Sequence, residues 1–175
     1  MPYKLLTINT KKHQIQQTAI NMKILFVCTA NICRSALAEA ILKKMLKEKG
    51  LTDIEVASAG VKNYEGNPRD ETLVAIAHEA GYDIDGVAHY INDSLLDADL
   101  IICMEHYHLV EMQKRLPYVR WDCIHLFNEI CFNERTDLIE PSGNTDYIYH
   151  YTFEKIQEGC ELLSQRIEKK ANERD

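Results

Sequence analysis

The stretch KILFVCTANICRSALAEAILKK, residues 23–44, constrains the fold of this chain more than any other segment. An apolar, strand-like run leads into Cys28, a short loop and Arg34, and a segment with apolar residues at spacings of three and four follows. A buried strand, a tight loop and an amphipathic helix in that order form the first half of a βα unit. The stretch therefore predicts a parallel sheet with helices crossing it.

The rest of the chain continues this alternation. Apolar runs of strand length and segments of helical spacing occur in turn at residues 55–60, 70–81, 99–104, 105–117, 123–127 and 153–167. Strands that alternate with helices are typical of an open α/β sheet with right-handed crossovers, and such sheets bind ligands at the carboxyl ends of their strands. The loop that follows Cys28 lies at such an end.

The length and composition fit a single core. A chain of 175 residues, 46% of them hydrophobic, can bury one core of ordinary size. Residues 1–21 are polar and precede the first strand-like run. We expect a leader at 1–21, for which disorder is one option, and one domain at 22–175.

Charge and hydropathy argue against several classes of protein. The formal net charge of −7 argues against nucleic acid or an anionic membrane as a partner, because both are bound by basic patches. No apolar run approaches the roughly 18 residues of a membrane span, and residues 1–21 lack the apolar centre of a signal peptide. We therefore expect a cytoplasmic protein whose six scattered cysteines are mostly reduced.

The loop from Cys28 to Arg34 has the chemistry of a phosphate site. Successive backbone N–H groups in such a loop converge on an anion, and the helix N-terminus adds a partial positive charge. Arg34 contributes a planar fork that binds two phosphoryl oxygens. This field, with a hydroxyl donor such as Ser35, favours the nucleophilic thiolate of Cys28. Alone, Cys28 would more often be a core thiol and Arg34 a solvated residue, but the combined pattern favours attack of Cys28 on phosphorus.

The segment VCTANICRS, residues 27–35, resembles the signature V-C-x-x-N-x-C-R-S of the low-molecular-weight protein tyrosine phosphatases, with every fixed position filled. The similarity runs from residue 22 to about residue 170 and includes SAG at 58–60. It implies a single doubly wound domain with a four-stranded parallel sheet and helices on both faces. It also implies hydrolysis of phosphotyrosine in proteins through a phosphocysteine, without a metal or another cofactor.

The resemblance implies a role for each residue of the loop. Cys28 would be the nucleophile, Arg34 the phosphate clamp and Ser35 a donor to the sulfur. Asn31 would hold the strained backbone of the loop through side-chain hydrogen bonds. The predicted phosphate-binding and loop-supporting residues are Thr29, Ala30, Asn31, Ile32, Cys33, Arg34 and Ser35.

Two further positions correspond to the substrate pocket of the family. Tyr64, four residues beyond SAG, matches the aromatic wall for the substrate ring, and Ile32 would form an apolar wall. Ala80 stands where some members have a histidine that supports the loop asparagine, which leaves the support of Asn31 open.

The general acid departs from the family pattern. Members carry an Asp-Pro pair on a late loop, whereas this chain reads DLIEPSG at 137–143, with Glu140 in place of the acid. A carboxylic acid beside a dianionic phosphate holds its proton more tightly, so a glutamate is competent to protonate the leaving oxygen. Asp137 is the alternative acid if the loop folds differently.

Other activities of the same fold stay open. Arginine phosphatases share the pattern but usually carry threonine where Ile32 stands, which favours phosphotyrosine here. Thiol-linked arsenate reductases need two relay cysteines on a later loop, and Cys103 falls near that place without a partner in the next helix. A non-catalytic phosphate-binding module would keep the loop and lose turnover, but the nucleophile, the clamp and an acid are all present.

The remaining thiols and histidines gave weaker expectations. Cys33 lies close enough in sequence to capture oxidised Cys28 as a disulfide, and a buried helix-start thiol is an equal alternative. His106 and His108, two apart at a helix start, would point in different directions and have no cysteine or acid cluster of zinc spacing nearby, so we expect no metal site. The oligomeric state does not follow from these patterns.

Overall fold

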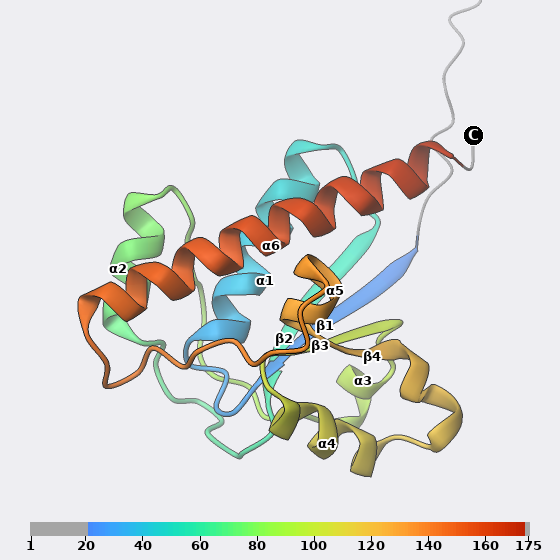
Figure 1. The fold of residues 1–175 in the computed structure, drawn as a ribbon, viewed down its shortest axis with the longest axis horizontal. Helices are drawn as coiled ribbons and strands as arrows, with labels where there is room; N and C mark the ends of the chain where they lie inside the picture. Colours follow the sequence, from blue (N-terminus) through green and yellow to red (C-terminus); the bar gives the residue numbers. More distant parts are fainter. Residues whose placement is uncertain (1–20, 174–175) are drawn as a thin grey trace, which may run out of the picture.

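The computed structural model describes residues 21–173, and its sheet confirms the predicted fold class (Figure 1). Four strands pair in the order β2-β1-β3-β4, and every pair is parallel. The strands are β1 (Met22–Cys28), β2 (Ile54–Gly60), β3 (Leu100–Cys103) and β4 (Ile124–Leu126). Apart from Asn21, the predicted leader at 1–21 lies outside the described residues.

Seven helical segments join and cover the strands (Figure 1). They are α1 (Arg34–Glu48), α2 (Glu71–Glu79), α3 (Asp93–Leu96), α4 (His106–Arg115), the short 3-10 helix η1 (Tyr118–Cys123), α5 (Phe127–Phe132) and α6 (Asp146–Asn172).

Helices cover both faces of the sheet because the side chains of β1 alternate between two cores. Ile24 and Phe26 point to the core formed with α1, α2, α5 and α6. Leu25 and Val27 point to the opposite core, where they pack with Met112 of α4. This alternation is the ordinary geometry of a strand buried on both faces.

The predicted ends of α1 and α2 agree closely with the structure, whereas α6 begins at Asp146, before the predicted segment at 153–167. Helix α1 ends at Glu48, and Gly50 then takes a φ of 72°, a conformation open to glycine at little cost. Helix α2 begins after Asp70, whose side chain accepts a hydrogen bond from the backbone N–H of Leu73 at 2.9 Å.

Three short segments, α3, η1 and α5, were not predicted. Each has six residues or fewer, which is too short for a helical period to be visible in the sequence. The apolar run at 123–127 was expected to be strand throughout, but Phe127 begins α5. Its ring centroid lies 6.4 Å from that of Phe26, and the ring fills the space beside Gly159, where a Cβ would meet it at 2.4 Å.

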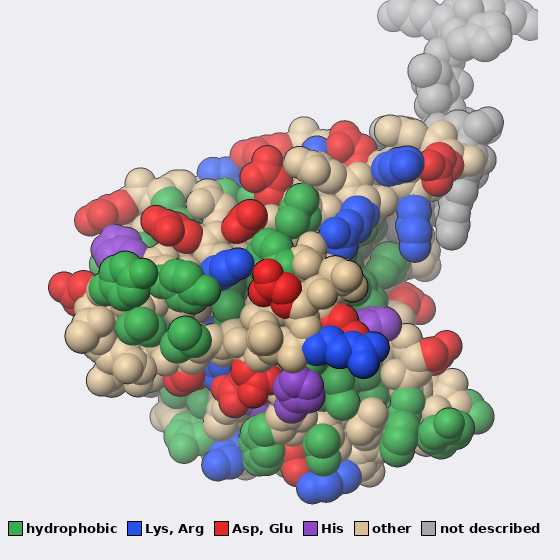
Figure 2. All heavy atoms as spheres, viewed as in Figure 1, with side chains coloured by type: hydrophobic (Ala, Val, Ile, Leu, Met, Phe, Trp, Pro, Cys, Tyr) green, Lys and Arg blue, Asp and Glu red, His purple; other side chains and the backbone are tan. Residues whose placement is uncertain are grey.

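The described surface carries both signs of charge. On the face that Figure 2 shows, acidic and basic side chains are interspersed, as expected from a net charge of −7 without a large basic patch. Among residues 21–173, no helix is both long enough and apolar enough to span a membrane.

Candidate active site

The loop between β1 and α1 lies at the carboxyl edge of the sheet, beside the end of β2. Cys28 is the last residue of β1 and pairs in register with Gly60. A Cβ at Gly60 would lie 2.7 Å from the carbonyl carbon of Ala30 and 2.8 Å from the carbonyl oxygen of Thr29. Only glycine lets the backbone of β2 approach the loop this closely, and Cys28 is buried at the base of the loop.

Asn31 holds the loop together from its centre. Its φ of 58° is left-handed, which is unfavourable for residues other than glycine. The amide nitrogen of Asn31 donates to the hydroxyl of Ser35 at 2.9 Å and to that of Ser58 at 2.7 Å. The amide oxygen accepts the backbone N–H of His89 at 2.8 Å and a guanidinium N–H of Arg69 at 2.9 Å. The support left open by Ala80 in the sequence therefore comes from other segments.

The same network directs two donors at the Cys28 sulfur. The Oγ of Ser35 lies 2.9 Å from Sγ, and the backbone N–H of Asn31 lies 3.3 Å from it. Because Ser35 Oγ accepts a hydrogen bond from Asn31, its own proton is available to Sγ. Two hydrogen-bond donors therefore contact the sulfur from within the loop.

Arg34 lies fully buried at the start of α1. Its Nη1 donates to the carbonyl of Leu138 at 2.6 Å, while Nη2 lies 2.6 Å from a carboxylate oxygen of Glu105 and 2.7 Å from one of Glu140. Burial opposes the charge, but Glu140, Cys28 and Glu105 together raise the pKa of Arg34. The guanidinium therefore stays charged.

Protein groups engage only part of the Nε–Nη2 edge of the Arg34 guanidinium. Nε has no hydrogen-bond partner among the described residues, and Nη2 contacts the two carboxylates without the angles of a hydrogen bond. Nε and Nη2 form the edge that binds two oxygens of a phosphoryl group side by side. A phosphate that binds this edge must displace the carboxylates of Glu105 and Glu140 from Nη2, and the clamp role of Arg34 stays a prediction.

The two candidate acids are in different environments. Glu140 contacts Arg34 and accepts the backbone N–H of Ser142 at 3.1 Å, with 38% of its side chain exposed. Asp137 instead accepts the backbone N–H of His106 at 2.7 Å and pairs with the ring of that residue. Partial burial raises the pKa of Asp137, but its contacts with His106 outweigh burial and hold the pKa below its ordinary value. Glu140 thus contacts the predicted phosphate clamp and Asp137 contacts His106, and the choice of Glu140 as the acid stays a prediction.

His108 supports the loop in a way that the sequence did not indicate. Its buried ring lies with Nε2 2.8 Å from the hydroxyl of Thr29, and its Nδ1 accepts the backbone N–H of Glu105 at 3.1 Å. Burial first, and Arg34 second, lower the pKa of His108 to about 4. The neutral ring therefore carries its proton on Nε2 and donates to Thr29. The only sequence signal is the position of His108 three residues after the helix cap at Glu105.

Ile32 and Tyr64, the predicted walls of the substrate pocket, lie in different environments. Ile32 is partly buried against the core of α1 and α6. Tyr64 is 42% exposed on the loop after β2, and no hydrogen bond or ring contact among the described residues joins its side chain to the phosphate loop. Of the tyrosines that follow Pro141, Tyr147 is exposed, whereas Tyr149 is buried and donates to Asp70 at 2.9 Å.

The cysteines are all free thiols. Cys33 is buried, and its Sγ lies 3.0 Å from the hydroxyl of Ser142 on the loop of Glu140. Burial raises the pKa of Cys33 well above its ordinary value. Cys103 is buried in β3, where burial likewise raises its pKa, and it is a core residue as expected.

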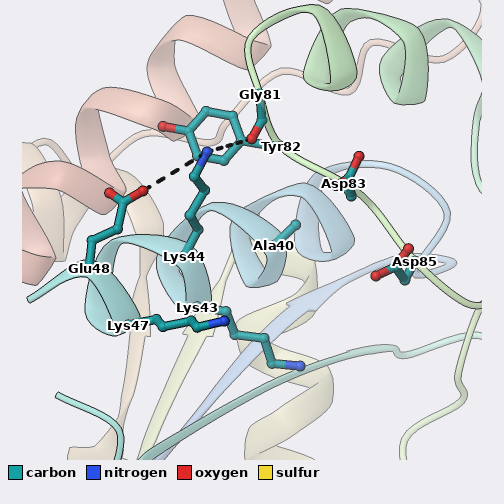
Figure 3. Close-up of a pocket in the computed structure, with 9 residues that line it drawn as sticks. All are labelled: Ala40, Lys43, Lys44, Lys47, Glu48, Gly81, Tyr82, Asp83 and Asp85. Atoms are coloured by element: carbon teal, nitrogen blue, oxygen red, sulfur yellow. Dashed lines mark hydrogen bonds and ion pairs between the residues drawn. The ribbon is translucent and has the colours of Figure 1, made fainter. Parts of the chain in front are cut away.

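A groove lies between α1 and the segment that follows α2 (Figure 3). Its charged residues offer no obvious anion site, because Lys44 already donates to the carbonyl of Gly81 at 2.6 Å and lies 4.0 Å from the carboxylate of Glu48. Asp83 and Asp85 add negative charge to the same groove. We assign no function to it.

The sequence is similar to known phosphatases over most of its length. The family model for low molecular weight phosphotyrosine protein phosphatase matches residues 23–173. The low molecular weight protein-tyrosine-phosphatase PtpA of Staphylococcus saprophyticus is 30% identical over 153 residues, which are 87% of this chain and 97% of the relative. The protein-arginine-phosphatase of Bacillus subtilis is 29% identical over 149 residues, which are 85% of this chain and 98% of that protein.

Solved structures share the fold. A protein tyrosine phosphatase from Entamoeba histolytica with Hepes in its active site superposes with a TM-score of 0.77 at 28% identity, covering 85% of this chain and 97% of the other. A YwlE arginine phosphatase mutant with a phosphorylated active-site serine gives a TM-score of 0.78 at 27% identity, covering 83% and 95% of the two chains.

Proposed function

The chain belongs to the low molecular weight phosphotyrosine protein phosphatase family, and we propose that it hydrolyses phosphotyrosine in proteins with Cys28 as the nucleophile. It is a hydrolase that acts on phosphorylated protein substrates. The observation that carries the proposal is the Cys28 sulfur, which receives two hydrogen-bond donors at the base of a loop that ends at the buried guanidinium of Arg34.

In the first step the thiolate of Cys28 attacks phosphorus, the bond from phosphorus to the tyrosyl oxygen breaks, and a sulfur–phosphorus bond forms. The equatorial oxygens are bound by the backbone N–H groups of the loop and by Nε and Nη2 of Arg34. The departing phenolate takes a proton from Glu140. The related phosphatase with a phosphorylated active-site serine supports phosphoryl transfer to the nucleophile position.

In the second step water attacks the phosphocysteine. Glu140, now a carboxylate, accepts the proton of that water while the sulfur–phosphorus bond breaks. Inorganic phosphate leaves and the Cys28 thiolate is restored to its contact with Ser35. Both steps use only side chains and backbone groups of this chain.

The loop sets the substrate class by the distance between the sulfur and the surface. Because Cys28 is buried, a short phosphoserine side chain would leave its phosphate above the sulfur, whereas an aryl ring would pass Ile32 and bring the phosphate into contact. Phosphoarginine is the second candidate, because the Bacillus subtilis relative is a protein-arginine-phosphatase. Ile32 in place of threonine favours the aryl substrate.

Turnover of matched peptides carrying phosphotyrosine, phosphoarginine or phosphoserine tests the proposal, alongside arsenate with a thiol reductant. We expect the highest kcat/KM for phosphotyrosine and no turnover by Cys28→Ser, which should still bind phosphate or vanadate. Equal kcat/KM for phosphotyrosine and phosphoserine, or near-native turnover by Cys28→Ser, would refute it. A preference for phosphoarginine that Ile32→Thr increases would establish the second candidate instead.

We also infer a reducing, cytoplasmic location. All six cysteines are unpaired, and a buried nucleophilic thiol retains activity only where it stays reduced. Loss of activity on transfer to an oxidising buffer, restored by a thiol reductant, is the expected behaviour.

A further inference from the structure

We propose that Arg69 is a positioning residue that fixes the phosphate loop at Asn31 and supplies a second positive charge beside Cys28. This inference rests on the proposed function, because it concerns the same loop. It goes further in assigning to this chain a second guanidinium, which reaches the loop from a segment outside the β1–α1 unit.

Arg69 holds Asn31 through two acceptors at once. One nitrogen, Nη1, donates to both the backbone carbonyl and the side-chain oxygen of Asn31, the latter at 2.9 Å. Its Nε is directed at the carbonyl of Asp85 at 3.4 Å. The partly buried guanidinium therefore joins the loop to the segments on either side of α2. Both hydrogen bonds from Nη1 are accepted by Asn31, whose backbone is left-handed with a φ of 58°.

These contacts also determine which way the Asn31 amide faces. Arg69 and the backbone N–H of His89 are both donors, so the oxygen of the amide must face them. The nitrogen is then left to donate to Ser35, and the Ser35 proton is left for the Cys28 sulfur. Arg69 thus stands at the far end of a chain of donors that ends on the nucleophile.

The charge of Arg69 is less compensated than that of Arg34. The guanidinium of Arg34 contacts the carboxylates of Glu105 and Glu140. Among the described residues, no carboxylate oxygen lies within ion-pair distance, 4.0 Å, of Arg69, whose acceptors are neutral carbonyl and amide oxygens. Burial lowers the pKa of Arg69 and the nearby charge of Glu39 raises it, so a single carboxylate beyond ion-pair distance partly balances this cation. A cation so placed favours a bound phosphate dianion.

Several other titratable groups surround the loop and are shared by all variants of Arg69. Glu105 and Glu140 contact Arg34, and Glu39 accepts a hydrogen bond from Ser58. Asp70 caps α2 and accepts a hydrogen bond from Tyr149. His108 of α4 and Cys33 of the loop are buried. A variant of Arg69 removes one charge and leaves this set in place.

The test is the pH dependence of Cys28 alkylation by iodoacetamide, followed by peptide mapping, in Arg69→Met, Arg69→Lys and the wild type. Arg135→Met is the matched control, because Arg135 is exposed, follows α5 and pairs with Glu129 of that helix. For Arg69→Met we expect the midpoint of alkylation to rise by roughly one pH unit. Inorganic phosphate should protect Cys28 about tenfold less well. Arg69→Lys should bring the alkylation midpoint most of the way back to the wild-type pH, because it keeps the positive charge. It should restore less of the phosphate affinity, because lysine lacks the planar fork of the guanidinium.

Unchanged midpoint and protection in Arg69→Met would overturn the proposal, as would an equal change in Arg135→Met. A fall in melting temperature alone, with the alkylation profile unmoved, would show a purely structural role and would overturn it too. The assay needs no turnover, so it is separate from the test of the proposed function. A further outcome is that the wild type fails to hydrolyse phosphotyrosine while Arg69→Met still shifts the pH profile of Cys28 alkylation. That outcome would refute the proposed function but support the role of Arg69.

Discussion

A carboxylate oxygen of Glu140 lies 2.7 Å from Nη2 of Arg34, so the proposed acid contacts the proposed phosphate clamp when no phosphate is bound. A phosphate dianion bound at Nε and Nη2 of Arg34 would compete at Nη2 with this carboxylate and with that of Glu105. We therefore expect substrate binding to release Glu140 from Arg34, and a carboxyl group beside the dianion to hold its proton more tightly. The contact between Glu140 and Arg34 would thus couple phosphate binding in the loop to protonation of Glu140.

Glu140→Gln should slow formation of the phosphocysteine by roughly 10²- to 10⁴-fold for poor leaving groups, because no proton then reaches the departing oxygen. With good leaving groups the loss should shrink. The same variant removes a negative charge from Arg34, so inorganic phosphate should bind more tightly than to the wild type. Single-turnover rates across aryl phosphates of graded leaving-group pKa, together with phosphate inhibition, measure both effects.

Asp137→Asn and Glu140→Asp are the matched variants. Asp137 is committed to His106, so its loss should leave the dependence on the leaving group nearly unchanged. Glu140→Asp tests whether the loop tolerates a shorter reach. If the slope of rate against leaving-group pKa steepens in Asp137→Asn and stays flat in Glu140→Gln, then Asp137 is the acid.

The buried ring of His108 makes folding stability depend on pH. Its pKa falls from 6.5 to about 4 on folding, so below pH 6.5 the unfolded chain binds a proton that the folded chain does not. This contribution is absent above pH 6.5 and grows as the pH falls toward 4, where it costs at most about 3 kcal/mol. Urea unfolding from pH 7 to 4.5 should show a steeper loss for the wild type than for His108→Asn.

Thr29→Val tests whether His108 acts on the phosphate loop through its hydrogen bond to Thr29. Asparagine at position 108 keeps an acceptor for the backbone N–H of Glu105 but does not reach Thr29, so His108→Asn and Thr29→Val should weaken phosphate binding by similar factors. The double variant should be no worse than either single one. Additive losses would mean that the two residues act on the loop separately.

The β1–loop–α1 unit could be predicted because its information is local. The apolar strand, the cysteine, the arginine and the helical spacing occupy one continuous stretch, and the structure joins them in that order. Ser35 was expected to donate to the sulfur, and its Oγ lies 2.9 Å from Cys28. Short range in sequence made these relationships visible.

The groups that brace the loop could not be predicted, because they arrive from distant segments. Arg69 is 38 positions from Asn31, His108 is 79 from Thr29, and Ser142 is 109 from Cys33. No periodicity or motif relates such positions, and only the packing of the sheet brings them together. The aromatic wall at Tyr64 was inferred from a motif position, and its role stays a prediction.

Gly60→Ala should disrupt phosphate binding through the backbone. The added Cβ would lie 2.7 Å from the carbonyl carbon of Ala30, so either the end of β2 or the phosphate loop must move. Because misplaced loop N–H groups weaken anion binding, we expect phosphate affinity and kcat/KM to fall by tenfold or more, on the order of 1.4 kcal/mol. Gly66→Ala is the control for a general loss of stability, because a φ of 81° strains an alanine there while its Cβ would meet no other atom. Native kinetics in Gly60→Ala would contradict the close approach.

Oxidation should be more fully reversible while Cys33 is present. Peroxide converts the Cys28 thiolate to a sulfenic acid, and attack by the Cys33 sulfur would form the disulfide and release water. To react, Cys33 must leave the hydroxyl of Ser142, 3.0 Å from its sulfur, and lose a proton that its raised pKa retains, so the disulfide should form slowly. After brief peroxide treatment, dithiothreitol should restore the wild type almost fully and Cys33→Ala only in part, because an uncaptured sulfenic acid proceeds to the irreversible sulfinic acid. Cys131→Ala, which removes a buried thiol of α5, should recover like the wild type. Mass spectrometry of the 28–34 peptide identifies each species, and full recovery of Cys33→Ala would exclude the disulfide as the protecting form.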